Sequence, residues 1–175
     1  ASLPCIKSLL IYMATLAELC ESGLLDTIDP LEPDELPWRT LYGTKDFIDW
    51  LDEGLLGLPH NPLYSELSPA EQVFALFAEY VSGDDFFTDR RFKKLSWTPE
   101  HYVWELKTEE VRVFGWVPKK DEFICCYGDS KDQILLQNSY GRYIAQTTYT
   151  RNNLALNDPK FVISGSYADV ISNKT

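Results

Sequence analysis

The first half of the chain has hydrophobic residues at helical spacing. Between residues 3 and 22 they recur every three or four positions, which predicts an amphipathic helix that Gly23 can end. Residues 26–40 interleave acidic residues with three prolines, which predicts a loop. After this loop, Thr44 can cap a short helix over 45–53 whose apolar side chains face inward.

A further helix start lies at residue 68. Ser68 can accept a hydrogen bond from the Glu71 amide, and the Glu71 side chain can reach back to the Ser68 amide. Pro69 suits the first helical position because its missing amide hydrogen is not needed there. The hydrophobic spacing continues to about residue 82, where Gly83 can end the helix. The sequence therefore predicts a helix over 69–82.

The pattern changes to short runs rich in aromatic and β-branched residues after Pro99. Three such runs, 101–107, 111–117 and 122–127, are joined by connections short enough for hairpins, which predicts an antiparallel meander. The middle run carries apolar residues on both of its faces. We therefore expect it to be a central strand that is covered on both sides.

A long helical pattern follows the predicted strands. Asp129 or Ser130 can cap it, it continues to about residue 154, and Gly141 can break it. The expected fold is α+β, with acidic N-terminal helices packed with a three- to four-stranded antiparallel sheet and a C-terminal helix. We expect an acidic helical region over 1–88 and a sheet plus helix over 89–175, together one compact unit.

The same boundary divides the charge. Residues 1–88 hold 16 acidic and 3 basic side chains, whereas residues 89–175 hold 11 acidic and 13 basic ones, and the whole chain has a net charge of −11. One interpretation of the acidic half is a surface that docks on a protein partner with a basic surface, such as a nucleic-acid-binding groove. The alternatives are a solvated acidic face, or a cover for the chain's own basic half. The candidate partner-binding residues are Glu32, Asp34, Glu35, Asp46, Asp49, Asp52 and Glu53.

The basic half offers a candidate RNA-binding surface. Lysines and arginines there alternate with Phe92, Trp97 and Tyr102, a combination that can bind phosphate and stack on bases. The alternatives are a solvated face, or a cationic helix end over residues 90–94. The candidate residues are Arg90, Arg91, Lys93, Lys94, Lys119 and Lys120.

Other chemistry-bearing residues are few. Glu105 lies in the middle of a predicted strand and can pair with Arg112 across a hairpin, either to position Arg112 or to satisfy a buried charge. His60 lies in a proline-bounded loop with no partner near it in the sequence, and His101 neighbours Glu100 without an obvious shared site. No glycine-rich phosphate loop, nucleophile elbow or metal-ligand spacing is present in the sequence, so we expect no cofactor and no metal.

The sequence also predicts where the protein resides in the cell. No apolar run reaches the roughly 18 residues that a membrane span needs, so we expect no membrane partner. The four cysteines form no C-x-x-C pair, which favours reduced thiols and a cytoplasmic protein.

Part of the predicted sheet resembles a known family. The runs 103–108, 111–116 and 123–124 resemble the central hairpins of RelE/HigB-type toxins and phage-derived toxin-like proteins. The resemblance implies a curved antiparallel sheet with helices on one side, which in this family often cleaves mRNA on the ribosome. Glu105, Lys107 and Arg112 match the strand motif and are the catalytic candidates that it implies.

These observations lead to one predicted function and two alternatives. The predicted function is a non-enzymatic macromolecule-binding protein from a phage or other mobile element, an inhibitor that docks its acidic surface on a nucleic-acid-handling complex. The alternative is a RelE-like endoribonuclease toxin that acts on RNA or the ribosome. A structural or assembly protein is a third interpretation.

Overall fold

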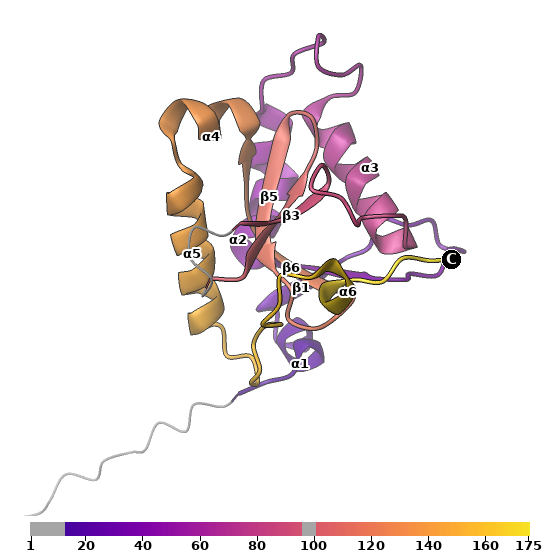
Figure 1. Ribbon diagram of the computed structural model, residues 1–175, viewed down its shortest axis with the longest axis vertical. Coiled ribbons are helices and arrows are strands. Elements are labelled where there is room, and N and C mark those ends of the chain that lie inside the picture. Colours follow the sequence, from indigo (N-terminus) through magenta and orange to yellow (C-terminus); the bar gives the residue numbers. More distant parts are fainter. Residues whose placement is uncertain (1–12, 96–100) are drawn as a thin grey trace, which may run out of the picture.

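The computed structural model describes residues 13–95 and 101–175. Its centre is a six-stranded sheet with the strand order β1-β2-β6-β5-β4-β3 (Figure 1). Neighbouring strands are antiparallel except β2 and β6, which are parallel. The strands are β1 Leu25–Ile28, β2 Thr40–Thr44, β3 Phe92–Leu95, β4 Val103–Lys107, β5 Val111–Trp116 and β6 Glu122–Ser130.

Helices cover both faces of this sheet. In Figure 1, α4 and α5 lie along one face and α3 lies on the other. The chain is thus α+β as predicted. The helical elements are α1 Leu16–Glu21, α2 Lys45–Asp49, the π-helical turn η1 Trp50–Gly54, the 3-10 turn η2 Leu55–Gly57, α3 Pro69–Ser82, α4 Lys131–Gln137, α5 Tyr140–Asn153 and α6 Tyr167–Val170.

The central strand is β5, as the sequence predicts. Val111 and Val113 pack into the core that α2 and α3 cover, whereas Phe114 and Trp116 pack on the opposite face. Next to a bulge, Gly115 allows β6 to approach, because a Cβ atom there would overlap the carbonyl oxygen of Ile124. This close approach explains why a glycine interrupts an otherwise apolar strand.

The prediction of a three- to four-stranded, purely antiparallel sheet is wrong in strand number and in pairing. β4, β5 and β6 match the three predicted strands, but β1, β2 and β3 were not foreseen. β1 overlaps the predicted loop 26–40, and β3 overlaps residues 90–94, for which a cationic helix end is one alternative. These added strands have four or five residues each, so they show little alternation and are stabilised by pairing with their neighbours.

Local signals place most helix ends correctly. The Ser68–Glu71 capping box, Pro69 at the first position and the left-handed Gly83 all define α3 as predicted. Thr44 caps α2, and Ser130 caps α4. The predicted C-terminal helix breaks at Asn138, which adopts φ 49°, rather than at Gly141.

The first predicted helix is shorter than expected. A capping box between Thr15 and Glu18 starts α1 at Leu16, and Ala14 instead forms a bridge with Leu156. The earlier part of the predicted helix, residues 3–12, lies outside the described residues. Within residues 13–22, only Leu16–Glu21 are helical.

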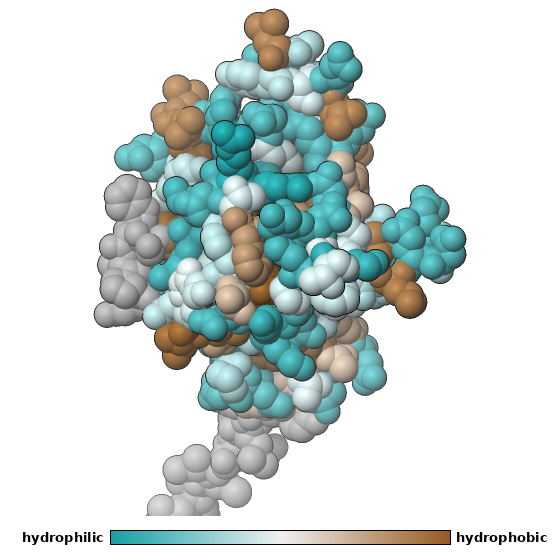
Figure 2. Space-filling view, turned by 45° about the vertical axis from the view of Figure 1, so that its right-hand side comes forward, coloured by the Kyte–Doolittle hydropathy of each residue, from teal (hydrophilic) through white to brown (hydrophobic). Residues whose placement is uncertain are grey.

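One face of the surface is mainly hydrophilic, and two of the thiols are buried. Figure 2 shows mostly hydrophilic residues on one face, with hydrophobic residues in separate groups. Within residues 13–95 and 101–175, no helix has the length and apolar character needed to cross a membrane. Cys125 and Cys126 are free thiols on opposite faces of β6, and burial raises the pKa of both.

Candidate functional site

An open pocket of about 570 Å³ lies where the tip of the β4–β5 hairpin meets α3 and the start of α4. Its walls come from segments that are far apart in the sequence: α3, the residues before β3, the hairpin and the first residue of α4. The lining residues are Leu67, Gln72, Ala75, Leu76, Glu79, Arg90, Arg91, Lys107, Thr108, Glu109, Arg112 and Lys131.

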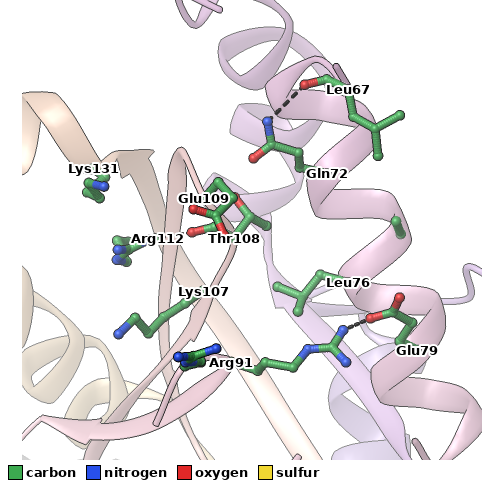
Figure 3. Close-up of a pocket in the computed structure, with 12 residues that line it drawn as sticks. Leu67, Gln72, Leu76, Glu79, Arg91, Lys107, Thr108, Glu109, Arg112 and Lys131 are labelled. Carbon is green, nitrogen blue, oxygen red and sulfur yellow. Dashed lines mark hydrogen bonds and ion pairs between the residues drawn. The ribbon is translucent and has the colours of Figure 1, made fainter. Parts of the chain in front are cut away.

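Positive charge dominates this pocket. Five lysines and arginines line it against two carboxylates, in a chain whose net charge is −11. In Figure 3, Lys131, Arg112 and Lys107 follow one another along one side, and we call these three residues the cationic row. Arg91 instead reaches across toward α3 and forms an ion pair with Glu79. Arg91 is therefore not counted in the cationic row, because its charge is paired with that of Glu79.

Strand register and a helix start build the cationic row. Lys107 and Arg112 are direct partners in the β4–β5 ladder, so their side chains leave the same face of the hairpin. Lys131 is the first residue of α4, and its backbone amide donates a hydrogen bond to the Glu110 carbonyl over 2.8 Å. That bond fixes the start of α4 against the hairpin tip, and so brings the third cation beside the first two.

The buried carboxylate of Glu105 lies behind the row. Its oxygens are 3.9 Å from Lys107 Nζ and 3.9 Å from Arg112 Nε, so the predicted pairing of Glu105 with Arg112 is present in the structure. Burial raises the pKa of Glu105, while Arg112 and Lys107 oppose that rise. Glu105 is thus a partial counter-charge for two residues of the cationic row. Tyr140 of α5 lies beside Glu105 and Arg112, and burial raises its pKa.

Backbone carbonyls hold the two cations of the hairpin. Arg112 Nη1 donates to the carbonyls of Thr108 and Val111, over 2.6 and 3.0 Å. Lys107 Nζ donates to the carbonyl of Asp89 over 3.0 Å, and burial lowers the pKa of Lys107. These bonds hold both side chains in defined positions.

A second buried carboxylate, Glu110, fastens the loop 58–67 beside the pocket. It accepts hydrogen bonds from the Asn61 amide over 2.7 Å and from Gln72 Nε2 over 2.6 Å, and it contacts His60 Nδ1 at 3.0 Å. Burial raises the pKa of Glu110, but these bonds outweigh it and leave the pKa below its ordinary value. His60, which has no partner near it in the sequence, thus finds one 50 residues away.

The predicted RNA-binding residues separate in space. Arg90 and Arg91 line the pocket, and they precede β3 rather than ending a helix. Lys93 is the ladder partner of Glu105, and Lys94 Nζ lies 4.4 Å from the centre of the Tyr102 ring. Lys119 and Lys120 lie beyond the opposite end of β5, away from the hairpin tip.

Two of the aromatic residues predicted to stack on bases also lie in different environments. Phe92 is fully buried in the core, so it is not available to a base. Tyr102 packs against Phe161 and Lys94, and Trp97 lies outside the described residues. His101 bonds Thr148 Oγ1 at 3.1 Å, while Glu100 also lies outside the described residues.

The predicted acidic residues form two groups. Glu32, Asp34 and Glu35 lie in the connection between β1 and β2, and the others lie on α2 and η1. All seven are exposed, and none of them forms an ion pair with another described residue. The second group consists of Asp46, Asp49, Asp52 and Glu53.

Sequence reasoning missed two contributors to the site. Lys131 belongs to the cationic row, and Tyr64 lies next to it with Lys131 Nζ 5.2 Å from the ring centre. The Ser130 cap places Lys131 in the first turn of α4, but nothing in the sequence shows that this turn meets the hairpin tip. Tyr64 is 67 residues away in the chain, so no local pattern links the two.

Two findings bear on what the site can hold. Among the residues that the structure describes, no group of three or more histidine, cysteine or acidic side chains could hold a metal ion. The pocket instead offers nitrogen donors with positive charge, which suit an anion such as phosphate. Comparisons with protein-family models, curated proteins and solved structures find no match to this chain.

Proposed function

We propose that this is a non-enzymatic macromolecule-binding protein that holds the phosphate backbone of RNA on the cationic row. The observation that carries the proposal is the concentration of positive charge in one open pocket of an otherwise acidic chain. Lysine and arginine side chains in such a pocket bind phosphates by charge and release the counterions of the nucleic acid. The ladder and backbone contacts of Lys107 and Arg112 support a preformed site.

Binding is favoured over catalysis by the position of Glu105, the carboxylate among the catalytic candidates. Glu105 is buried behind Lys107 and Arg112 and is not among the residues that line the pocket. Of the two lining carboxylates, Glu79 is paired with Arg91, and Glu109 is exposed at the hairpin tip. A general base must reach the proton that it removes, and Glu105 does not face the pocket where RNA would lie.

The RelE-like endoribonuclease remains the alternative proposal. It is favoured by one observation, the clustering of Glu105, Lys107 and Arg112 that the family resemblance implies as catalytic candidates. The two proposals differ in what happens to the RNA after binding. Incubation of the protein with labelled RNA, followed by denaturing electrophoresis, should leave the RNA intact if the protein only binds. Cleavage that Arg112→Ala abolishes would favour the ribonuclease.

A charge-reversal pair tests the binding proposal. Lys131→Glu reverses one cation of the row, and the helix dipole tolerates an acidic residue in the first turn of α4. Lys120→Glu makes the same change in net charge on an exposed residue outside the pocket. In fluorescence anisotropy with a labelled single-stranded RNA, we expect Lys131→Glu to weaken binding about tenfold or more. Lys120→Glu should bind like the wild type.

Two results would contradict the proposal. One is an equal loss of affinity in both variants, which would show that only the overall charge matters. The other is the absence of RNA binding by the wild-type protein at low salt, where electrostatic binding is strongest. Circular dichroism and thermal unfolding of both variants would confirm that each remains folded.

A second candidate function rests on the exposed acidic residues. The seven predicted carboxylates have no ion pair among the described residues, so a basic protein partner could contact them without breaking an existing pair. A synthetic arginine-rich peptide is a direct probe of this surface. If the proposal holds, reversing Asp46, Asp49 and Asp52 to lysine should abolish binding of the peptide by calorimetry. Unchanged binding would contradict it.

A further inference from the structure

Tyr64 lies at one end of the cationic row on the loop 58–67. Its ring centre is 5.2 Å from Lys131 Nζ, within the range of a cation–π contact. The side chain is nevertheless 46% exposed. An aromatic ring that is both next to a phosphate-binding cation and open to solvent has the arrangement of a stacking platform.

The loop that carries Tyr64 is held in place by several hydrogen bonds. Glu110 accepts from the Asn61 amide, and the Tyr64 amide donates to the Asn61 carbonyl over 3.0 Å. Gln72 Nε2 bonds the Leu67 carbonyl over 2.9 Å and so fixes the other end of the loop to α3. The backbone that carries the ring is therefore held in place, and little loop ordering is needed when a ligand binds.

We propose that the ligand is single-stranded nucleic acid and that Tyr64 stacks on one of its bases, while the adjacent phosphates lie on Lys131 and Arg112. This inference rests on the proposed function, and it adds the strand state of the ligand and a residue that contacts a base. Only an unpaired base exposes its face to a side chain, because the bases of a duplex are stacked on each other. The cationic row alone would accept either form.

The environment of the ring is compatible with a base. Leu63 and Leu67 lie on the same loop and are exposed, so the loop also presents apolar side chains to solvent. An acidic peptide with apolar side chains would be the competing occupant. The aromatic ring next to the row favours the nucleic acid, because every base has a π-face that can stack on tyrosine.

A set of tyrosine variants tests the inference. Tyr64→Ala removes the ring, Tyr64→Phe keeps the ring without the hydroxyl, and Tyr149→Ala removes a more exposed tyrosine on α5 as a control. The probes are a labelled single-stranded RNA of about ten nucleotides, the same length of abasic strand, and the matching duplex, each measured by anisotropy. Tyr64→Ala should bind the single strand about 5- to 150-fold more weakly than the wild type. Tyr64→Phe and Tyr149→Ala should retain full affinity.

The abasic strand and the duplex make the test specific. Neither offers a free base, so Tyr64→Ala should bind both as the wild type does. The inference is overturned if Tyr64→Ala binds the single strand normally while Lys131→Glu does not, a result that leaves the proposed function standing. If the wild type binds none of the three probes, both the inference and the proposed function are overturned. A further outcome is that polyglutamate displaces the strand and binds Tyr64→Ala as tightly as it binds the wild type. That result would identify an acidic peptide as the ligand class instead.

Discussion

Arg112 Nε lies 3.9 Å from Glu105 Oε2, and both side chains are buried between the sheet and α5. Neither of these two atoms has a hydrogen-bond partner among the described residues. The interaction is therefore mainly one of charge, and it partly neutralises Arg112 at the point where a ligand phosphate would bind. If the cationic row binds phosphate as proposed, the negative charge of Glu105 would oppose that binding.

The pH dependence of stability should reveal this carboxylate. Burial raises the pKa of Glu105 in the folded protein above about 4.5, so the folded state binds its proton more tightly than the unfolded state. The resulting stabilisation is complete below about pH 4.5 and is lost as the pH rises through the folded-state pKa. We expect the unfolding free energy of the wild type to fall relative to that of Glu105→Gln over this interval. Urea unfolding at a series of pH values measures it.

The matched control for Glu105 is Glu109→Gln, which neutralises an exposed carboxylate of the same hairpin. If the difference in unfolding free energy between wild type and Glu105→Gln does not change with pH, the raised pKa of Glu105 is contradicted. In the binding assay, Glu105→Gln should also hold single-stranded RNA several-fold more tightly, because a negative charge near two cations of the row is removed.

Glu110 should be necessary for the position of the loop 58–67. Glu110→Ala removes the acceptor of the Asn61 amide and one of the two acceptors of Gln72 Nε2, and we expect a loss of about 1–3 kcal/mol in unfolding free energy. Glu109→Ala, one residue earlier, should change stability by less than about 0.5 kcal/mol. Hydrogen exchange should show the Asn61 amide exchanging faster in Glu110→Ala only. Protection that persists there would mean that other contacts hold the loop.

Two glycines should respond to alanine in opposite directions. At Gly115 a methyl group would overlap the Ile124 carbonyl across the β5–β6 pair, so Gly115→Ala should destabilise the protein by about 1–3 kcal/mol. At Gly141, near the start of α5, no atom lies within 4 Å of an added Cβ. Gly141→Ala should therefore stabilise by up to about 1 kcal/mol through helix propensity. Chemical denaturation compares them, and a Gly115→Ala protein as stable as the wild type would contradict the close approach at Gly115.

Local sequence signals explain the predictions that succeeded. Ser68, Pro69 and Glu71 define the start of α3 by contacts within a single turn, so they can be read without tertiary information. Runs rich in aromatic and β-branched residues likewise placed β4, β5 and β6. The four-residue β1 and β3 carry two exposed or half-exposed positions each, and they become strands only because neighbouring strands offer free backbone groups.

The candidate site depended on contacts that no local pattern encodes. The sequence grouped Arg90 to Lys94 by proximity, yet the structure places Arg90 and Arg91 in the pocket and Lys94 on Tyr102. It paired Glu105 with Arg112 correctly, because both lie on one predicted hairpin. Lys131 and Tyr64 join them only through the packing of α4 and the loop 58–67 against the hairpin tip, which tertiary structure alone determines.

The salt dependence of binding tests the cationic row most directly. Association constants for a labelled single-stranded RNA are measured at several salt concentrations for wild type, Lys131→Ala and Lys120→Ala. If the three residues of the row each contact one phosphate, the slope of log K against log salt should be about −2 for the wild type and Lys120→Ala, and about −1.4 for Lys131→Ala. A slope near zero, or one that Lys131→Ala leaves unchanged, would contradict phosphate binding on the cationic row.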